Sequence, residues 1–264
     1  NNQIVERSHD TPLFTHRSFI SRSLPDSLMS RGGFEKLAES LLEVKDIKGS
    51  LDKRNVSVQL YTDSVGTEQS LKDLSGQEIN IMHFATHGMY MYPEEAELKR
   101  NTNNFKFIST READTYYTSE DKALTRSFLV MAGGNKLLRR YTVVDEEDDG
   151  VLTALEISLL DFRNLDLVVL SACQSGLGDT SMDGVVGLQR GFKKAGANTI
   201  LMSLDKVDDE ATRILMVEFY RNLMDGKSKH QSLKDAQKYL RNVENGKYNK
   251  PEYWASFIML DGLN

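Results

Sequence analysis

Short apolar runs alternate along the chain with amphipathic stretches of helical length. Apolar runs without strict polar alternation are typical of parallel strands that are covered on both faces. The runs predicted as strands are 56–62, 79–86, 127–132, 165–172, 198–204 and 253–260. The stretches predicted as helices are 34–47, 67–74, 152–160, 184–195, 208–224 and 228–243. This order predicts an α/β fold of three layers, with a mostly parallel central sheet flanked by helices and right-handed crossovers between strands.

The helix predicted at 208–224 has the clearest ends. It begins with Asp208, Asp209 and Glu210, acidic residues that cap free backbone amides and suit the positive end of the helix dipole. Gly226 is its expected stop, because glycine readily adopts the left-handed conformation that ends many helices.

Two polar segments interrupt the alternation. Residues 94–126 are rich in Asn, Thr, Lys and Glu, and residues 145–149 are all acidic. We expect both to be surface insertions; the acidic run is a candidate site for a basic partner, although such runs are usually solvated loops. The first residue is Asn, which favours a piece of a longer protein. We therefore expect residues 1–33 to be a lead-in from that protein and residues 34–264 to form the domain.

The composition narrows the classes of function. The 264 residues are 39% hydrophobic with a net charge of −6, and Lys and Arg are scattered, which argues against direct contact with nucleic acid. No apolar run is long enough to span a bilayer, so no contact with a membrane is expected. The single cysteine excludes an intrachain disulfide and a Cys-rich zinc site, and it is compatible with a reducing cytoplasm, where we expect the protein to be.

That cysteine, Cys173, follows the predicted strand 165–172, and His87 follows the predicted strand 79–86. Functional residues of open α/β sheets gather at the carboxyl ends of the strands, so a thiol and an imidazole are expected at one sheet edge. Gly176 and Gly178 leave the backbone after Cys173 free to turn closely.

Attack of a cysteine on an acyl carbon needs a base, a proton donor for the leaving amine and donors for the oxyanion. His87 can act as base and acid for Cys173, and the backbone amides of Gly88 and Cys173 can form an oxyanion hole. Taken alone, a lone cysteine is more often a small buried apolar residue, and a histidine after a strand is more often structural. His83, which lies mid-strand between apolar residues, is expected to be structural.

Four strings, HFATHG, LVVLSACQSGLGD, GVVGLQRGFKKAGANTILMSL and PEYWASFIMLDG, carry a family resemblance. From about Phe34 to the C-terminus the chain resembles the CHAT domain, a caspase-like peptidase domain often attached to tetratricopeptide repeats in bacteria. The resemblance implies a caspase–hemoglobinase fold and a dyad of Cys173 and His87. It also implies cleavage of peptide bonds without a cofactor or a metal.

The chain departs from the resemblance in the segment SLDKVDD, where Asp205 and Lys206 stand in place of the Trp and Pro that relatives often have. This strand end borders the specificity pocket of caspase-like folds, so the resemblance makes Asp205 a candidate acid for a basic P1 side chain. Asp205 as a solvated or helix-capping residue is the alternative. Asp179 and Asp183 are weaker candidates for the same role.

The sequence thus predicts a bacterial cysteine endopeptidase that acts on a protein or peptide. The resemblance implies regulation by an N-terminal repeat region or an activating partner, and a role in antiviral defence or programmed cell death. A catalytically silent scaffold that binds proteins is one alternative, which the intact pair of Cys173 and His87 disfavours. An acyltransferase or amidase with the same pair is another.

Overall fold

The computed structural model describes residues 33–90, 123–135, 149–172, 178–181, 184–205 and 207–261. For 178–181 and 184–186 it describes the backbone alone. The polar segment 94–126 and the acidic run 145–149 lie almost entirely outside these ranges, as does the lead-in 1–33. No helix within the described ranges combines the length and the apolar character that crossing a membrane requires.

The central sheet has the order β1-β5-β8-β9. Its strands are β1 (Ile81–Phe84), β5 (Leu167–Leu170), β8 (Thr199–Ser203) and β9 (Phe257–Leu260). The first three are parallel, and β9 pairs with β8 in the antiparallel sense. The mostly parallel sheet predicted from the apolar runs is therefore confirmed, and the predicted strands 79–86, 165–172 and 198–204 supply its parallel part.

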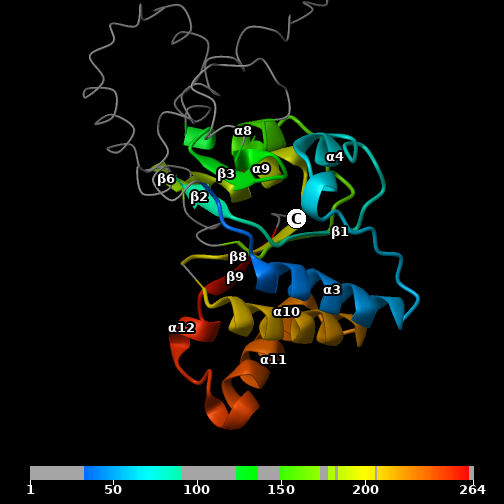
Figure 1. Ribbon diagram of the computed structural model, residues 1–264, viewed down its shortest axis with the longest axis vertical. Helices are drawn as coiled ribbons and strands as arrows, with labels where there is room; N and C mark the ends of the chain where they lie inside the picture. Colours follow the sequence, from blue (N-terminus) through cyan, green and yellow to red (C-terminus); the bar gives the residue numbers. More distant parts are fainter. Residues whose placement is uncertain are drawn as a thin grey trace, which may run out of the picture.

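Helices cover both faces of this sheet (Figure 1). One layer holds α3 (Ala38–Asp52), α10 (Asp209–Met224) and α11 (Lys229–Asn242), with α12 (Pro251–Trp254) beside them. The other layer holds α4 (Glu68–Lys72), α8 (Ala154–Ile157) and α9 (Leu188–Ala195). Single turns of 3-10 helix lie at Asp63–Val65 and Val243–Gly246. The three layers are compatible with the caspase-like fold that the sequence predicts.

Beside the main sheet lies a second sheet, in the order β2-β3-β4. Its strands are β2 (Gly88–Tyr90), β3 (Ser127–Val130) and β4 (Val151–Thr153), all antiparallel. A separate hairpin consists of β6 (Gly178–Ser181) and β7 (Gly184–Gly187). The run 127–132 does form a strand, β3, but β3 lies in the second sheet and not in the parallel sheet as predicted. Its two edges pair with β2 and β4, so no edge is left for a parallel strand.

Some predicted elements need correction. Residues 56–62 form no strand: Val56 and Tyr61 are exposed, and the segment lacks a paired neighbour among the described strands. The predicted helices 152–160 and 184–195 each begin with a strand, β4 and β7. The predicted strand 253–260 begins inside α12. In each case an apolar run is compatible with both a strand and a helix. A strand forms only where a neighbouring strand is available to pair with it.

The ends of α10 are as predicted. Asp208 is its N-cap, and the Asp208 side chain accepts a hydrogen bond from the Ala211 N–H at 2.9 Å. Gly226 follows the helix with a φ of 83°, the left-handed conformation that glycine adopts without strain. The Asp208 cap thus fixes the start of α10, the helix that follows β8 in the chain.

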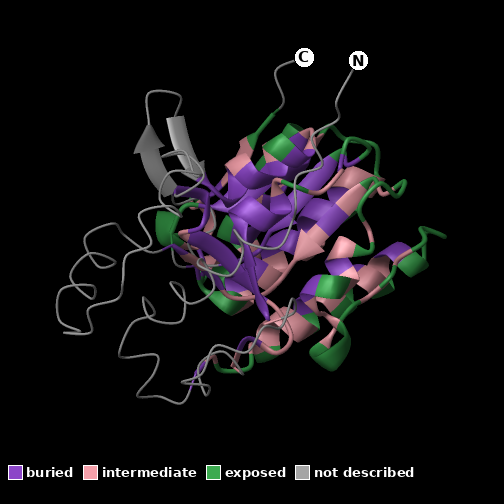
Figure 2. Ribbon diagram, turned by 90° about the horizontal axis from the view of Figure 1, so that it is seen from above, coloured by how far each residue is buried: buried purple, intermediate pink, exposed green. Residues whose placement is uncertain are grey.

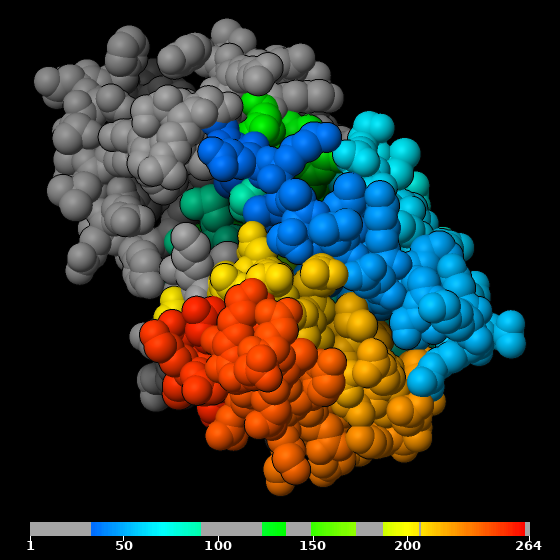
Figure 3. Space-filling view, turned by 60° about the horizontal axis from the view of Figure 1, so that its bottom comes forward, coloured from blue at the N-terminus to red at the C-terminus, as the bar shows by residue number. Residues whose placement is uncertain are grey.

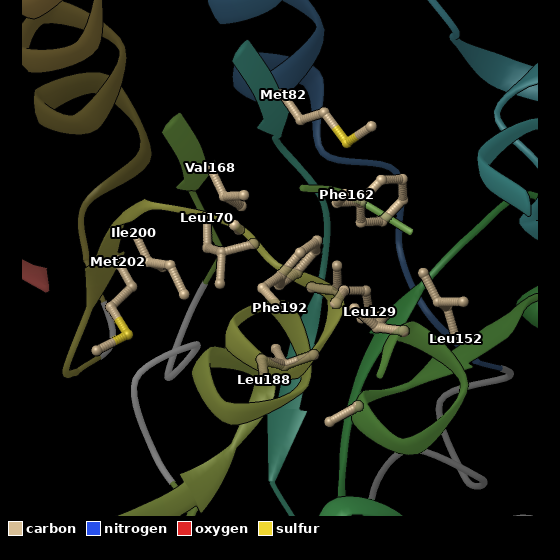
Figure 4. Packing of buried hydrophobic residues seen from close by; sticks show 14 of the residues in the cluster. Met82, Leu129, Leu152, Phe162, Val168, Leu170, Leu188, Phe192, Ile200 and Met202 are labelled. Atoms are coloured by element: carbon tan, nitrogen blue, oxygen red, sulfur yellow. The ribbon is translucent and has the colours of Figure 1, made fainter. Parts of the chain in front are cut away.

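Two apolar cores lie on the two faces of the sheet. Successive side chains of a strand point to opposite faces, so in β5 Val168 and Leu170 enter one core while Leu167 and Val169 enter the other. Buried residues fill the centre of the molecule in Figure 2. Figure 4 shows the first core, in which Phe192 of α9 lies among Leu170, Leu188 and Leu129. The sheet edge that carries the candidate site is therefore supported from both sides.

Candidate active site

His87 lies in the short link between β1 and β2, at the carboxyl end of β1. Thr86 and His87 are both hydrogen-bonded to Val130 of β3. The Thr86 hydroxyl donates to the Val130 carbonyl, and the Val130 N–H donates to the His87 carbonyl at 2.9 Å. The second sheet therefore fixes the position from which the His87 ring projects.

A carbonyl from outside the sheet orients the imidazole ring. His87 Nε2 lies 2.7 Å from the carbonyl oxygen of Glu35. A carbonyl can only accept, so Nε2 carries the hydrogen and, in the neutral ring, Nδ1 keeps its lone pair. The Phe34 ring lies against the imidazole, with 5.4 Å between ring centroids. His87 is thus held in the tautomer whose Nδ1 can take up a proton.

The segment that supplies this carbonyl is itself clamped. The Phe34 N–H donates to Asn135 Oδ1 at 2.7 Å, and Asn135 Nδ2 donates to the Phe34 carbonyl at 2.9 Å. Asn135 lies 101 residues away in the chain. The sequence predicted residues 34–37 as helix and carried no signal for these contacts.

The strand that leads to Cys173 ends at the same sheet edge. The Ser171 N–H donates to the Phe84 carbonyl at 2.8 Å, and the Ser203 hydroxyl donates to the Ala172 carbonyl at 2.8 Å. Cys173 and Asp183 lie outside the described residues, and the side chain of Asp179 in β6 is likewise not described. The dyad of Cys173 and His87 therefore stays a prediction. The described ends of β1 and β5, which lead to these two residues, lie side by side.

Gly88 begins β2 and is buried. His87 and Val130 share a backbone hydrogen bond, so the next pair of the antiparallel ladder, Gly88 and Leu129, is a non-hydrogen-bonded pair. The Gly88 N–H therefore points away from β3. The role of this N–H as a donor to a substrate oxyanion stays a prediction.

Behind His87 lies a buried polar network around Glu43 of α3, which is 2% exposed. Glu43 Oε1 lies 2.8 Å from His83 Nε2, and Glu43 Oε2 accepts from the Ser171 hydroxyl at 3.1 Å. His83 Nδ1 lies 3.1 Å from the Tyr220 hydroxyl. Burial and then the charge of Glu43 raise the pKa of Tyr220, so its hydroxyl stays protonated. The structural role predicted for His83 is consistent with these contacts.

Sequence reasoning missed Glu43. The signal was its spacing, because Glu43 precedes Ile47 by four residues and Leu51 by eight, and all three lie on the buried face of α3. An acid on the apolar face of an amphipathic helix is expected to have buried partners.

A cavity of about 30 Å³ lies between His87 and this network. Residues of α3, the two strand ends and the first turns of α10 enclose it. The polar residues among them are Ser40, Glu43, Thr86, Ser171, Asp209 and Thr212. The Thr212 hydroxyl is buried and has no hydrogen-bond partner among the described atoms. Figure 3 shows α3 and α10 side by side on the outer face of this region.

The cavity is acidic. Burial raises the pKa of Asp209, the neighbouring Asp208, Glu39 and Glu43 raise it further, and His87 opposes them. Asp205, the predicted specificity acid, lies exposed beyond the end of β8, and its carbonyl accepts from the Ser203 hydroxyl at 3.1 Å. Asp205 is not among the described residues that line the cavity. Within the described ranges, no three His, Cys, Asp or Glu side chains are grouped so that they could hold a metal ion.

Comparisons with known proteins agree with this architecture. The family model of the CHAT domain matches residues 3–262. A mouse protein named tetratricopeptide repeat protein 28 is 35% identical over 111 residues, which cover 42% of this chain and 4% of that protein. The human protein of the same name is 31% identical over 110 residues, again 42% of this chain and 4% of the relative. The matched stretch is thus a small part of each relative.

Proposed function

Because the chain belongs to the CHAT domain family, we propose that it is a cysteine endopeptidase in which Cys173 attacks the scissile carbonyl and His87 is its acid and base. The observation that carries the proposal is the hydrogen bond from His87 Nε2 to the Glu35 carbonyl. It leaves Nδ1 as the basic nitrogen at the edge to which β5 leads the chain.

The proposed pair can carry out both the acylation and the deacylation of peptide-bond cleavage. His87 Nδ1 takes the thiol proton, and the thiolate of Cys173 forms a bond to the carbonyl carbon. The oxyanion that develops accepts from the N–H groups of Gly88 and Cys173. When the tetrahedral species collapses, the C–N bond breaks and Nδ1–H gives its proton to the leaving amine. Water, deprotonated by the same nitrogen, then releases the acyl group from sulfur.

The Glu35 carbonyl has a further part in this cycle. His87 becomes a cation after taking the proton, and a carbonyl oxygen at 2.7 Å from Nε2 stabilises that cation. It also keeps the ring from rotating. Because the contact is made by backbone, no substitution of the Glu35 side chain removes it directly.

Substrate and regulation are part of the proposal. We propose cleavage after a basic P1 residue, with Asp205 and, more weakly, Asp179 as candidate acids. The relatives are named for tetratricopeptide repeats, which supports control by a repeat region or an activating protein partner. A cytoplasmic role in antiviral defence is proposed on the family resemblance.

The test uses the only cysteine of the chain. A thiol-reactive peptide warhead should label the protein at Cys173, and Cys173→Ala should abolish both labelling and cleavage of proteome-derived peptides followed by mass spectrometry. His87→Ala should lower kcat by about 100- to 10,000-fold, because it removes the general base. His230→Ala is the matched control, since His230 is 62% exposed and remote from both strand ends, and it should leave kcat unchanged.

The outcomes separate the alternatives. Absence of labelling under every activating condition would favour a silent protein-binding scaffold. Labelling with transfer of the acyl group to an acceptor other than water would indicate an acyltransferase. Cleavage that persists in Cys173→Ala would refute the proposed nucleophile.

A further inference from the structure

We propose that the cavity beside His87 receives the ammonium group of a lysine side chain at P1, and that Asp209 is the residue that selects it. The inference rests on the proposed peptidase function, because it assigns the side chain that precedes the scissile bond. It adds a specificity residue, Asp209, for which the sequence predicts only a role in capping a helix.

The position of the cavity fits a P1 side chain. In attack on a peptide carbonyl, the P1 side chain branches from the carbon next to the attacked atom, so it lies beside the nucleophile and the base. The cavity is bounded by His87 on one side and by Ser171 on the other, and Ser171 precedes Cys173 by only two residues. It therefore lies next to the two strand ends that lead to the proposed dyad.

The charge of the cavity favours a cation. Glu43 is buried at its base, and Asp209 borders it from the first turn of α10. The described lining contains no Lys or Arg. The nearby Arg213 is engaged elsewhere, at 3.1 Å from Glu39 and 2.8 Å from Asp46. A bound cation would relieve the repulsion between the Asp209 and Glu43 carboxylates.

A second observation points to a ligand in the same place. Thr212 is 4% exposed, lines the cavity, and its hydroxyl oxygen has no hydrogen-bond partner among the described atoms. An unpaired buried hydroxyl is unfavourable, because no hydrogen bond replaces the ones that it made to water in the unfolded chain. An ammonium group has three donors, which match Thr212, Asp209 and the free lone pairs of Glu43.

The size of the cavity distinguishes lysine from arginine. A water-sized group needs roughly 10–15 Å³ of such space, and the cavity holds about 30 Å³. A compact ammonium group is of this size, whereas a planar guanidinium needs room for four heavy atoms in one plane. The volume of the cavity therefore fits an ammonium group better than a guanidinium group.

The experiment compares peptides that differ only at P1, with lysine, arginine or the uncharged norleucine, in the natural protein. Asp209→Asn should lower kcat/KM for the lysine peptide by about 10- to 100-fold and leave the norleucine peptide unchanged, since one charged hydrogen bond is lost. Thr212→Val, which keeps the side-chain shape, should lower kcat/KM for the lysine peptide by about 3- to 10-fold. Asp225→Asn, at the opposite end of α10, is the matched control and should leave every ratio unchanged.

Each outcome decides the proposal. A wild-type preference for lysine over arginine and norleucine that Asp209→Asn removes supports it. Cysteine-dependent cleavage that shows no preference for lysine, or a preference that only Asp205→Asn removes, overturns it and leaves the peptidase function standing. Cleavage that does not depend on Cys173 overturns the function and this inference together. Thermal unfolding of each variant shows whether a lost activity reflects a lost fold.

Discussion

At the scale of single residues, Glu68 is the most unusual carboxyl group that the structure describes. It is fully buried at the start of α4, and its Oε1 accepts from the N–H groups of Gly150 and Val151 at 2.7 and 3.2 Å. Burial, followed by the charges of Glu156 and Asp149, raises its pKa to about 8. Lys72, 3.2 Å from Oε2, opposes this rise without cancelling it.

This pKa predicts a pH dependence of stability. Between pH 4.5, the ordinary pKa of the group, and pH 8, the folded chain holds a proton on Glu68 that the unfolded chain has lost. The free energy of unfolding should therefore fall as pH rises through this window. Glu68→Gln should flatten this slope in urea unfolding measured from pH 4.5 to 8.

Asp161→Asn is the control for this measurement. The hydrogen bonds from Arg163 lower the pKa of Asp161 to about 2, so its contribution is lost only in more acidic solution. The slope between pH 4.5 and 8 should be unchanged in Asp161→Asn. An equal slope in Glu68→Gln and the wild type would show that Glu68 is not the group responsible.

At the scale of elements, the contact between α9 and α8 depends on a glycine. A Cβ at Gly191 would lie 2.5 Å from the Ala154 carbonyl oxygen and 3.0 Å from the Ala154 Cα. The two helices pack backbone to backbone at this point, and Phe192, the residue after Gly191, lies in the core beside Leu170. Gly191 therefore sets the distance between these helices.

Gly191→Ala should lower the free energy of unfolding by about 1–3 kcal/mol, because the overpacking exceeds the gain in helix propensity. Gly49→Ala in α3 is the matched control, since no atom lies within 4 Å of its built Cβ. It should raise the free energy of unfolding by about 0.5–1 kcal/mol. Urea unfolding of both variants measures the difference, and a stabilised Gly191→Ala would mean that α8 can shift at no cost.

At the scale of the whole molecule, the two cores share one sheet. Each core takes alternate side chains of β5, so loss of packing on one face removes support from the other. Phe192 is fully buried in the first core, whereas Trp254, the one tryptophan of the chain, packs against the second. We therefore expect the two cores to unfold together.

Phe192→Ala should lower the free energy of unfolding by about 3–5 kcal/mol, and the fluorescence of Trp254 should report the full loss although it lies across the sheet. Far-ultraviolet circular dichroism should give the same midpoint. A Trp254 transition that keeps the wild-type midpoint would show that the two layers unfold separately.

Local sequence patterns were enough to predict the parallel strands β1, β5 and β8, the capped helix α10, and the position of His87 at a strand end. These features depend on local patterns: a buried strand reads as an apolar run, and a helix start reads as capping acids. The same local signals were insufficient for 56–62, where an apolar run found no strand to pair with, and for β3, which joined a second sheet.

The surroundings of His87 depend on tertiary contacts that local patterns do not encode. The Glu35 carbonyl, the Asn135 clamp and the buried Glu43 come from segments up to 101 residues apart, and no local pattern encodes which of them meet. The acidic cavity likewise exists only because α3 and α10 pack against the same two strand ends. A side chain's burial and partners depend on these distant contacts, which is why Asp209 reads as a cap in the sequence and as a pocket residue in the fold.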